Sequence, residues 1–177
     1  MFRASGVIVL AFLVLAGCGK RETAAEQRQR EAVELSYKAL DRLKANDNTG
    51  AKSLLKRALD VDPLCEKARE VLASMEAQIR AARTQVGLIE TAVQTYESSV
   101  NSYPPSLQAL RSQPKHLPDP SKWAGPYLYH DIPKDPWGNP YQFAVPGTHN
   151  PNSFDVWSYG PDGANGTADD IGNWDHP

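Results

Sequence analysis

One apolar pattern constrains this chain more than any other, because it requires a single long helix. From Cys65 to Val100, apolar residues recur in steps of three and four without a break. They are Cys65, Ala68, Leu72, Met75, Ile79, Ala82, Val86, Ile89, Val93, Tyr96 and Val100. Such spacing places them on one side of an α-helix, expected from about Leu64 to Asn101 and roughly 55 Å long at about 1.5 Å per residue. Gly87 weakens this helix by about 1 kcal/mol relative to alanine and is a candidate position for a bend.

The same spacing would also suit a free-standing coiled coil. No consistent pattern of charges flanks the apolar residues, which argues against that arrangement. We therefore expect the first half of the helix to close a helical hairpin and the second half to pack on whatever follows it. The prolines support this division, because only one of the 14, Pro63, precedes Tyr103.

Residues 1–17 have the organisation of a lipoprotein signal peptide rather than of a folded segment. A positive charge at Arg3 precedes about a dozen apolar residues, too few for an ordinary membrane-spanning helix. The following LAGC, which ends at Cys18, resembles the lipobox of bacterial lipoproteins, in which the cysteine is lipidated. An ordinary signal peptide with a chance cysteine is the alternative. A lipid on Cys18 would anchor the chain to a membrane, facing the periplasm, and Gly19 in place of an aspartate favours the outer membrane over the inner.

Residues 18–30 are polar and charged, and we interpret them as a tether, with a fraying helix start as the alternative. Within residues 31–81, four residues have the spacing of the small, large, small and proline positions of a tetratricopeptide repeat: Ala51, Leu55, Ala58 and Pro63. The segment is therefore interpreted as a single repeat-like helical hairpin whose first helix spans about residues 32–45, with a generic helical hairpin as the alternative. One such unit cannot bury its own apolar face, so it must pack on the next helix or on a partner.

Five sequence blocks in the second half are more specific. They are TQVGLIETAVQTYESSVNSYPPSLQAL (84–110), WAGPYL (123–128), DPWGNPYQF (135–143), FDVWSYGPDG (154–163) and DDIGNW (169–174). In this order and spacing they resemble the globular domain of the major pseudopilin of type II secretion, general secretion pathway protein G. The resemblance covers about residues 82–174, so we interpret residues 82–177 as a pseudopilin G-like globular domain. It implies partners in a secretion or pilus-like system and no enzymatic activity.

The residues themselves favour the α+β fold that this resemblance implies. Pro104 and Pro105 stop the long helix, and a short helical turn capped by Ser106 is expected at residues 106–112. Beyond it, alternating side chains and the turn-rich sequence DPWGNP predict extended segments at residues 127–129, 141–145 and 154–159. We therefore expect a long helix packed on a small antiparallel sheet.

Near its C-terminus the chain carries three aspartates on a glycine-rich loop: Asp162, Asp169 and Asp170. Carboxylates at such a short separation repel one another, so the arrangement requires protonation, solvent or a cation. Calcium takes carboxylate and carbonyl oxygens in flexible geometry, although the spacing is not that of an EF-hand. The resemblance implies a structural calcium site made of these three carboxylates and the backbone carbonyls of Tyr159 and Ala164. A solvated acidic turn is the alternative, and Trp174 is expected to pack back onto the sheet.

Other chemistry finds little support in the sequence. The histidines have no ligand-like spacing, so we expect them to be solvated: His116, His130, His149 and His176. Four aromatic residues would suit a sugar-binding surface but are more typical of a core: Trp137, Trp157, Tyr141 and Tyr159. If Cys18 is lipidated, Cys65 has no disulfide partner and is expected to pack as a small apolar residue, an exposed thiol being the alternative. The formal net charge of −2 and the lack of basic runs give no reason to expect a nucleic-acid partner, and no small-molecule substrate is indicated.

The N-terminal half departs from the pseudopilin pattern. Members of that family begin with a short basic leader and a long apolar helix that carries an early glutamate, whereas residues 1–81 here are signal-like and then polar. The first hypothesis is a non-enzymatic, lipid-anchored, calcium-stabilised pseudopilin-like component of a type II secretion or related pilus-like system. The alternative is a periplasmic scaffold or binding lipoprotein unrelated to secretion. An enzyme acting through the aspartates is the least favoured hypothesis.

Overall fold

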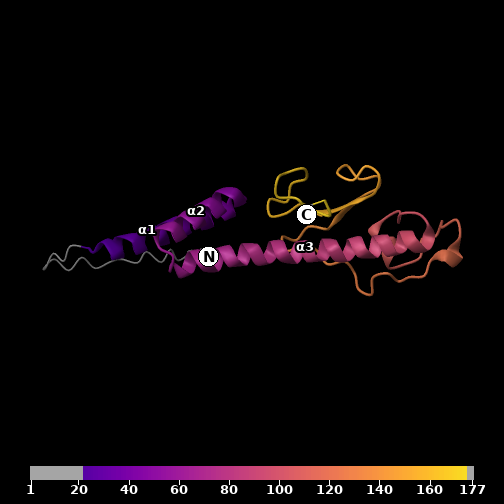
Figure 1. Cartoon of the computed structure of the whole chain (residues 1–177), viewed down its shortest axis with the longest axis horizontal. Coiled ribbons are helices and arrows are strands. Elements are labelled where there is room, and N and C mark those ends of the chain that lie inside the picture. The colour runs from indigo at the N-terminus through magenta and orange to yellow at the C-terminus, as the bar shows by residue number, and fades with distance from the viewer. Residues whose placement is uncertain (1–21, 175–177) are drawn as a thin grey trace, which may run out of the picture.

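The computed structural model describes residues 22–174 and shows one long helix with a helical hairpin at one end and a small sheet along the other (Figure 1). The helices are α1 (Ala24–Lys44), α2 (Asn48–Val61) and α3 (Glu66–Val100), and two short 3-10 helices follow at Leu107–Leu110 and Pro120–Lys122. The strands are β1 (Gln142–Ala144), β2 (Asp155–Ser158) and β3 (Ile171–Gly172). Among the described residues, no helix has the length and apolar character needed to span a membrane. The predicted signal peptide and Cys18 lie outside the described residues.

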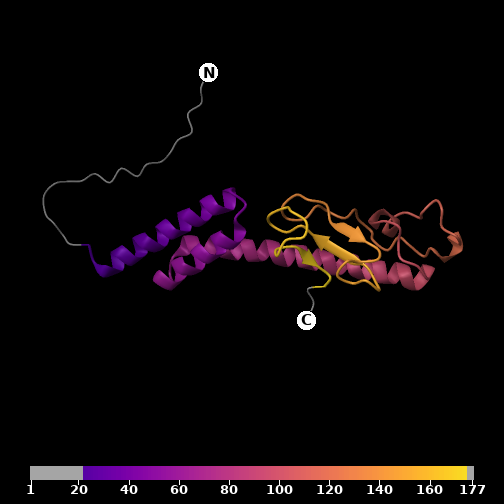
Figure 2. The ribbon, with the colours of Figure 1, turned by 90° about the horizontal axis from the view of Figure 1, so that it is seen from above.

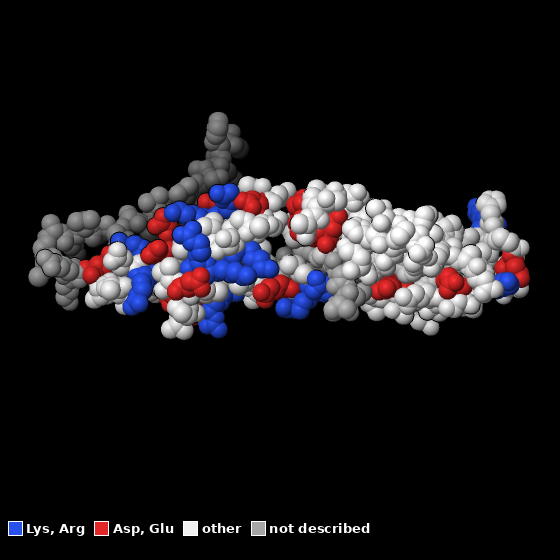
Figure 3. Space-filling view, turned by 45° about the horizontal axis from the view of Figure 1, so that its top comes forward, with Lys and Arg blue, Asp and Glu red and all other residues white. Residues whose placement is uncertain are grey.

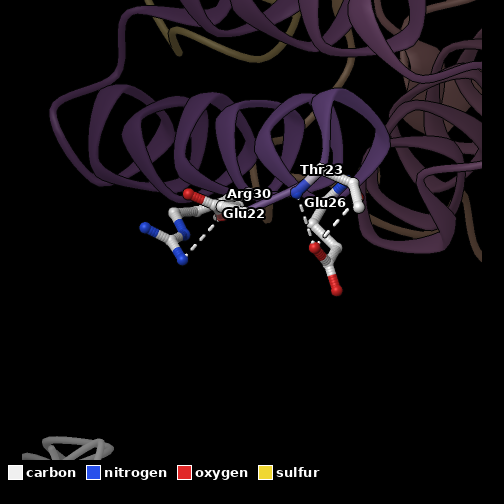
Figure 4. A network of polar contacts seen from close by, with 4 residues as sticks. All are labelled: Glu22, Thr23, Glu26 and Arg30. Atoms are coloured by element: carbon white, nitrogen blue, oxygen red, sulfur yellow. Dashed lines mark hydrogen bonds and ion pairs between the residues drawn. The ribbon is translucent and has the colours of Figure 1, made fainter. Parts of the chain in front are cut away.

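Helix α1 begins at Ala24 rather than near residue 32, because Thr23 and Glu26 form a capping box (Figure 4). The Thr23 Oγ1 accepts a hydrogen bond from the Glu26 N–H at 3.2 Å, and the Glu26 carboxylate accepts one from the Thr23 N–H at 2.8 Å. Two N–H groups that a helix start leaves unpaired are thereby satisfied. The segment predicted as a polar tether, residues 18–30, is therefore helical from Ala24 onward. The tether interpretation is wrong for these residues, and the alternative of a helix start is confirmed.

Helices α1 and α2 pack as an antiparallel hairpin through small side chains, which lets their backbones approach closely (Figure 2). Its fully buried alanines are Ala32, Ala39, Ala51 and Ala58. The first turns of α3 cover one side of the hairpin, where Ala68 and Val71 join the same core. Cys65 is 5% exposed and its Sγ lies 3.6 Å from the Ser36 Oγ, which confirms its packing as a small buried residue. The helical hairpin is present, and its relation to a tetratricopeptide repeat stays a prediction.

The apolar face of α3 is confirmed, but its middle is less buried than its two ends. The ends belong to separate cores, one including Ala68 and the other including Val93, both fully buried. The half-buried stretch between them contains Leu72, Met75 and Ile79. The helix is continuous through Gly87. It ends at Val100, and the capping residue Asn101 has a φ of 59°, the left-handed conformation common just after helix ends.

The three strands form an antiparallel sheet in the order β1-β2-β3, which packs on the second half of α3 (Figure 2). Phe143 of β1 pairs with Val156 of β2, and Trp157 of β2 pairs with Gly172 of β3. Val156 and Tyr96 of α3 are fully buried in the core between sheet and helix. This arrangement confirms the predicted α+β fold, a long helix on a small antiparallel sheet.

Three local predictions differ from the structure. Residues 127–129 form no strand, because the N–H groups of Tyr127 and Leu128 both donate to the Leu110 carbonyl, at 2.8 and 3.2 Å. The short helix at Leu107–Leu110 receives no side-chain cap from Ser106. Strand β3 is absent from the sequence-based prediction, because two residues are too few to show alternation.

Candidate metal centre

The candidate site lies in the loop that connects β2 to β3, residues 159–170. Because these strands are antiparallel neighbours, the loop leaves the sheet and returns to it, so its start lies close to its end. Gly160 has a φ of 67°, and a Cβ at this position would collide with the backbone carbonyl of Asp169. Glycine permits both the conformation and the close approach, so Gly160 allows the loop to close.

Each of the three predicted aspartate ligands accepts a hydrogen bond from the loop itself. The Asp162 carboxylate accepts one from the Ala164 N–H at 2.8 Å, and the Asp170 carboxylate accepts one from the Gly166 N–H at 2.7 Å. The Asp169 carboxylate accepts one from the Asp162 N–H at 3.2 Å. The loop is therefore folded around its own carboxylates.

Asp170 is the least satisfied of the three aspartates. Its Oδ1 is buried and has no hydrogen-bond partner among the described residues. Burial raises the pKa of the Asp170 carboxyl, and the negative charges of Asp162 and Asp169 raise it further, although the hydrogen bond from Gly166 lowers it. A cation beside Asp170 would offset both the burial and the repulsion, since each disfavours the charged carboxylate.

The predicted ligands have the right donor atoms for a hard, oxygen-binding cation, but these atoms do not surround a common position. All five predicted ligands come from one loop and offer only oxygen, as calcium prefers: Tyr159, Asp162, Ala164, Asp169 and Asp170. Within residues 22–174, however, no three acidic, histidine or cysteine side chains converge in a metal-binding cluster. The carboxylates bond to N–H groups of the loop instead. The structure thus brings the residues into one loop without gathering their oxygens around one point.

Trp174 packs back onto the end of the sheet, as predicted. Its indole ring covers Gly172 of β3, where an added Cβ would contact the ring within 2.5 Å. The ring centroid of Trp174 lies 6.1 Å from that of Trp157, and the His149 ring stacks on Trp174 at 3.7 Å. These contacts pack the segment that follows the aspartate loop, which includes β3 and Trp174, against β2.

A buried aspartate that the sequence analysis missed connects the sheet to the preceding turn. Asp135 is 4% exposed, and its Oδ1 accepts hydrogen bonds from the N–H groups of Trp137 and Asn139 at 3.1 and 2.8 Å. Its Oδ2 accepts one from the Ser158 Oγ at 2.5 Å. Burial, and then the charge of Asp135, raise the pKa of Tyr141 to about 12. The signal was available, because an aspartate that opens a Pro–Gly turn often accepts from that turn's N–H groups.

Asp155 is a second buried aspartate that the sequence analysis did not single out. It alternates with Val156 along β2 and is only 2% exposed. Its carboxylate accepts hydrogen bonds from the N–H groups of His149 and Asn150 at 2.8 and 3.0 Å. Burial of this aspartate therefore organises the loop between β1 and β2.

The exposure predicted for the histidines agrees with the structure better than the burial predicted for four aromatic residues. Three histidines are exposed as expected, and the fourth lies outside the described residues: His116, His130, His149 and His176. Of the aromatic residues expected in the core, Tyr141 is buried and three are half-buried: Trp137, Trp157 and Tyr159. The core interpretation is therefore fully confirmed only for Tyr141.

Comparisons with known proteins agree with this fold. A family model described as type II secretion system (T2SS), protein G matches residues 70–174. Type II secretion system core protein G of Pseudomonas aeruginosa is 38% identical over 107 residues, which are 57% of this chain and 74% of that protein. The protein of the same name from Pectobacterium carotovorum subsp. carotovorum is 37% identical over 102 residues, covering 56% of this chain and 64% of that relative.

A solved structure of a major pseudopilin is also similar to this chain. The crystal structure of the major pseudopilin from the type 2 secretion system of enterohaemorrhagic Escherichia coli has a TM-score of 0.50 and 33% identity. It covers 59% of this chain and 92% of that chain. The residues that the family model matches contain most of α3 and the whole sheet, whereas α1 and α2 precede them.

Proposed function

The chain belongs to the type II secretion system protein G family, and from this membership we propose that it is a non-enzymatic structural component of a type II secretion or related pilus-like system. The observation that carries the proposal is the family match over residues 70–174, which includes the whole sheet. Its partners would be other proteins of that system. A scaffold unrelated to secretion is not favoured, because the matched residues form the helix-and-sheet unit itself. The hairpin of α1 and α2 would act as a repeat-like adaptor beside it.

The secretion role is tested by co-purification of secretion-system proteins with the full chain from native membranes. The control is Val156→Asp, which places a charge in the fully buried core between sheet and α3. We expect the wild type to recover secretion components and the core variant to lose them. Absence of secretion components from the wild-type sample would contradict the proposal.

We further propose that Cys18 carries a lipid and places the chain on the periplasmic side of a membrane, the outer rather than the inner. The support is the LAGC sequence directly after the apolar stretch. Metabolic labelling with radioactive palmitate tests this point. Wild type and Cys65→Ser should incorporate label, because Cys65 is buried in the hairpin core, whereas Cys18→Ser should not. Label retained by Cys18→Ser would refute lipidation at this residue.

We also propose that the aspartate loop binds calcium as a structural ion. The carboxylates of Asp162, Asp169 and Asp170 would hold it, with the carbonyls of Tyr159 and Ala164. The support is the all-oxygen donor set together with the buried, unpartnered Oδ1 of Asp170. Calcium would supply positive charge that offsets repulsion among the carboxylates. It would stabilise the fold because it binds the closed loop and not the unfolded chain.

Thermal unfolding in calcium and in EGTA tests the site. At a free calcium concentration about 100 times the dissociation constant, the expected stabilisation is about 2.7 kcal/mol. For a chain of this size that corresponds to a rise in Tm of roughly 5–10 °C. Asp170→Asn should abolish the rise, whereas Asp60→Asn, on the exposed face of α2, should keep it. Equal Tm values in calcium and EGTA would remove the support for this site.

A further inference from the structure

The turn between α2 and α3 carries an apolar side chain that the fold leaves in water. Leu64 is 76% exposed, more than any other leucine, isoleucine or valine among the described residues, and Pro63 beside it is exposed as well. Two cavities of about 590 and 440 Å³ flank this turn, and Leu64 lines both. The first reaches Ala25 and the second reaches Val33, so the Pro63–Leu64 turn lies beside the first turns of α1.

The backbone donors of this turn are already paired. The Leu64 N–H donates to the Asp62 carboxylate at 3.0 Å, and the Cys65 N–H donates to the Asp62 carbonyl at 3.0 Å. Pro63 has no N–H. An unpaired N–H costs free energy when it is removed from water, and these hydrogen bonds avoid that cost. The Pro63–Leu64 turn is therefore suited to an apolar environment in its backbone as well as in its side chains.

The lipid proposed at Cys18 places a membrane close to this turn. Glu22, the first described residue, follows Cys18 by four residues, which span at most about 14 Å. Helix α1 begins two residues later, and its Ala25 lines one cavity together with Leu64. The membrane that holds the lipid is therefore within reach of the turn, whereas the sheet lies toward the other end of α3 (Figure 2).

The charges around the turn do not form a basic surface. Three acidic and two basic side chains line the two cavities: Glu26, Asp62, Glu66, Arg28 and Lys67. Lys67 also pairs with Glu70 at 3.1 Å. In Figure 3, Lys and Arg side chains lie among Asp and Glu side chains over the helical half rather than apart from them. A membrane contact at this turn therefore depends on burial of apolar surface and not on attraction to anionic headgroups.

We propose that the Pro63–Leu64 turn inserts into the surface of the membrane that holds the Cys18 lipid. Leu64 enters the boundary between headgroups and acyl chains, and burial of its side chain favours the inserted state. The inference rests on the proposed lipid, which keeps the turn beside the membrane. The lipid alone leaves the folded chain free to rotate about its attachment. The turn adds a second contact that holds the hairpin against the membrane, and α3 leads from that contact to the sheet.

Fluorescence quenching tests the insertion on the lipidated chain, purified from membranes and reconstituted in phosphatidylcholine vesicles. In a Cys65→Ser background, nitrobenzoxadiazole is attached at Leu64→Cys or at the matched control Leu88→Cys. Leu88 is 54% exposed and lies in the half of α3 that carries the sheet. Phosphatidylcholine that bears a nitroxide should quench most of the fluorescence at residue 64 and leave that at residue 88 unchanged. Equal quenching at the two positions would overturn the proposal.

The native leucine is tested with the label moved to a neighbouring position. Gln29 is exposed and lines both cavities, so a label at Gln29→Cys in the same background reports on the same surface. Leu64→Glu should reduce its quenching by about twofold or more, because burial of a leucine favours the inserted state by about tenfold or more. Leu88→Glu should leave the quenching unchanged. The same quenching with Leu64 and with Leu64→Glu would show that Leu64 does not insert.

Flotation of the same vesicles on a density gradient separates this inference from the lipid on which it rests. A chain that floats with the vesicles while the label at residue 64 stays unquenched overturns the insertion and leaves the lipid in place. A wild-type chain that does not float overturns the lipid at Cys18 and the insertion with it. Emission at residue 64 that shifts to the blue with rising protein concentration, without quenching by the nitroxide lipid, assigns the turn to a second copy of the chain and overturns the proposal.

Discussion

Replacing Tyr96 with phenylalanine should stabilise the protein, although Tyr96 is fully buried in the centre of its core. The ring packs against Tyr127, with their ring centroids 5.3 Å apart. The Tyr96 Oη, however, is buried and has no hydrogen-bond partner among the described residues. Burial accordingly raises the pKa of this hydroxyl, and Tyr127 raises it further. The substitution keeps the ring contacts and removes only the unpaired oxygen.

A buried hydroxyl without a partner costs about 1–3 kcal/mol of desolvation. Part of this gain is lost to the small void that the oxygen leaves, so we expect about 1–2 kcal/mol of net stabilisation. At about 2–4 °C per kcal/mol for a chain of this length, Tm should rise by roughly 2–8 °C. Urea unfolding followed by circular dichroism, together with a thermal scan, measures both quantities.

Tyr103→Phe is the matched control, because it makes the same chemical change at a hydroxyl that has a partner. The Tyr103 Oη lies 3.2 Å from the Ser153 Oγ. Loss of this hydrogen bond should destabilise the protein by about 0.5–1.5 kcal/mol, opposite in sign to the effect at Tyr96. Destabilisation by Tyr96→Phe as well would show that the core hydroxyl is hydrogen-bonded in solution, and would refute the reasoning.

Four further measurements test local parts of the structure. Gly87→Ala should stabilise α3 by about 0.5–1 kcal/mol, because a Cβ there meets open space; no gain in urea unfolding would contradict this. Gly50→Ala should destabilise the hairpin in the same assay, because its Cβ would press against the Asp47 carboxylate that caps α2. Asp135→Ala should cost about 2–4 kcal/mol, since it leaves two N–H groups and a hydroxyl without their acceptor, and a loss within error would refute that role. The folded-state pKa of Tyr141 is raised to about 12, above the ordinary value of 10, so its contribution to stability is complete below pH 10 and is lost as the pH rises to about 12. Tyr141→Phe should flatten this alkaline loss, and identical pH profiles would exclude Tyr141 as its source.

The long helix could be predicted from the sequence because its signal is local and repeated. Each step of three or four residues places another apolar side chain on the same face of the helix. The helix bounds expected near Leu64 and Asn101 therefore differ little from those of α3. The helical hairpin was predictable for the same reason. The start of α1 was missed because it depends on one reciprocal contact, between Thr23 and Glu26, rather than on a period.

Features that depend on contacts outside a local repeat could not be predicted from the apolar pattern of the sequence. Strand β3 has two residues and exists because β2 supplies its hydrogen-bond partners. Asp155 is buried in β2 because backbone N–H groups from the preceding loop satisfy it. The three loop aspartates were identified by type and proximity, but their hydrogen bonds to the loop are set by its backbone path. Their role in calcium binding stays a prediction.

The junction between the two halves of the chain lies inside a helix, and this has a mechanical consequence. The domain boundary predicted between residues 81 and 82 falls within α3, which runs for 35 residues without a break. A helix of that length spans about 52 Å and has no flexible linker, so the separation of the two cores along it is fixed. Both cores use the same face of α3 without meeting, which leaves Met75 and Ile79 partly uncovered between them. The cleft that these two side chains line is therefore a product of the continuous helix, and its width is set by the number of turns between the hairpin and the sheet.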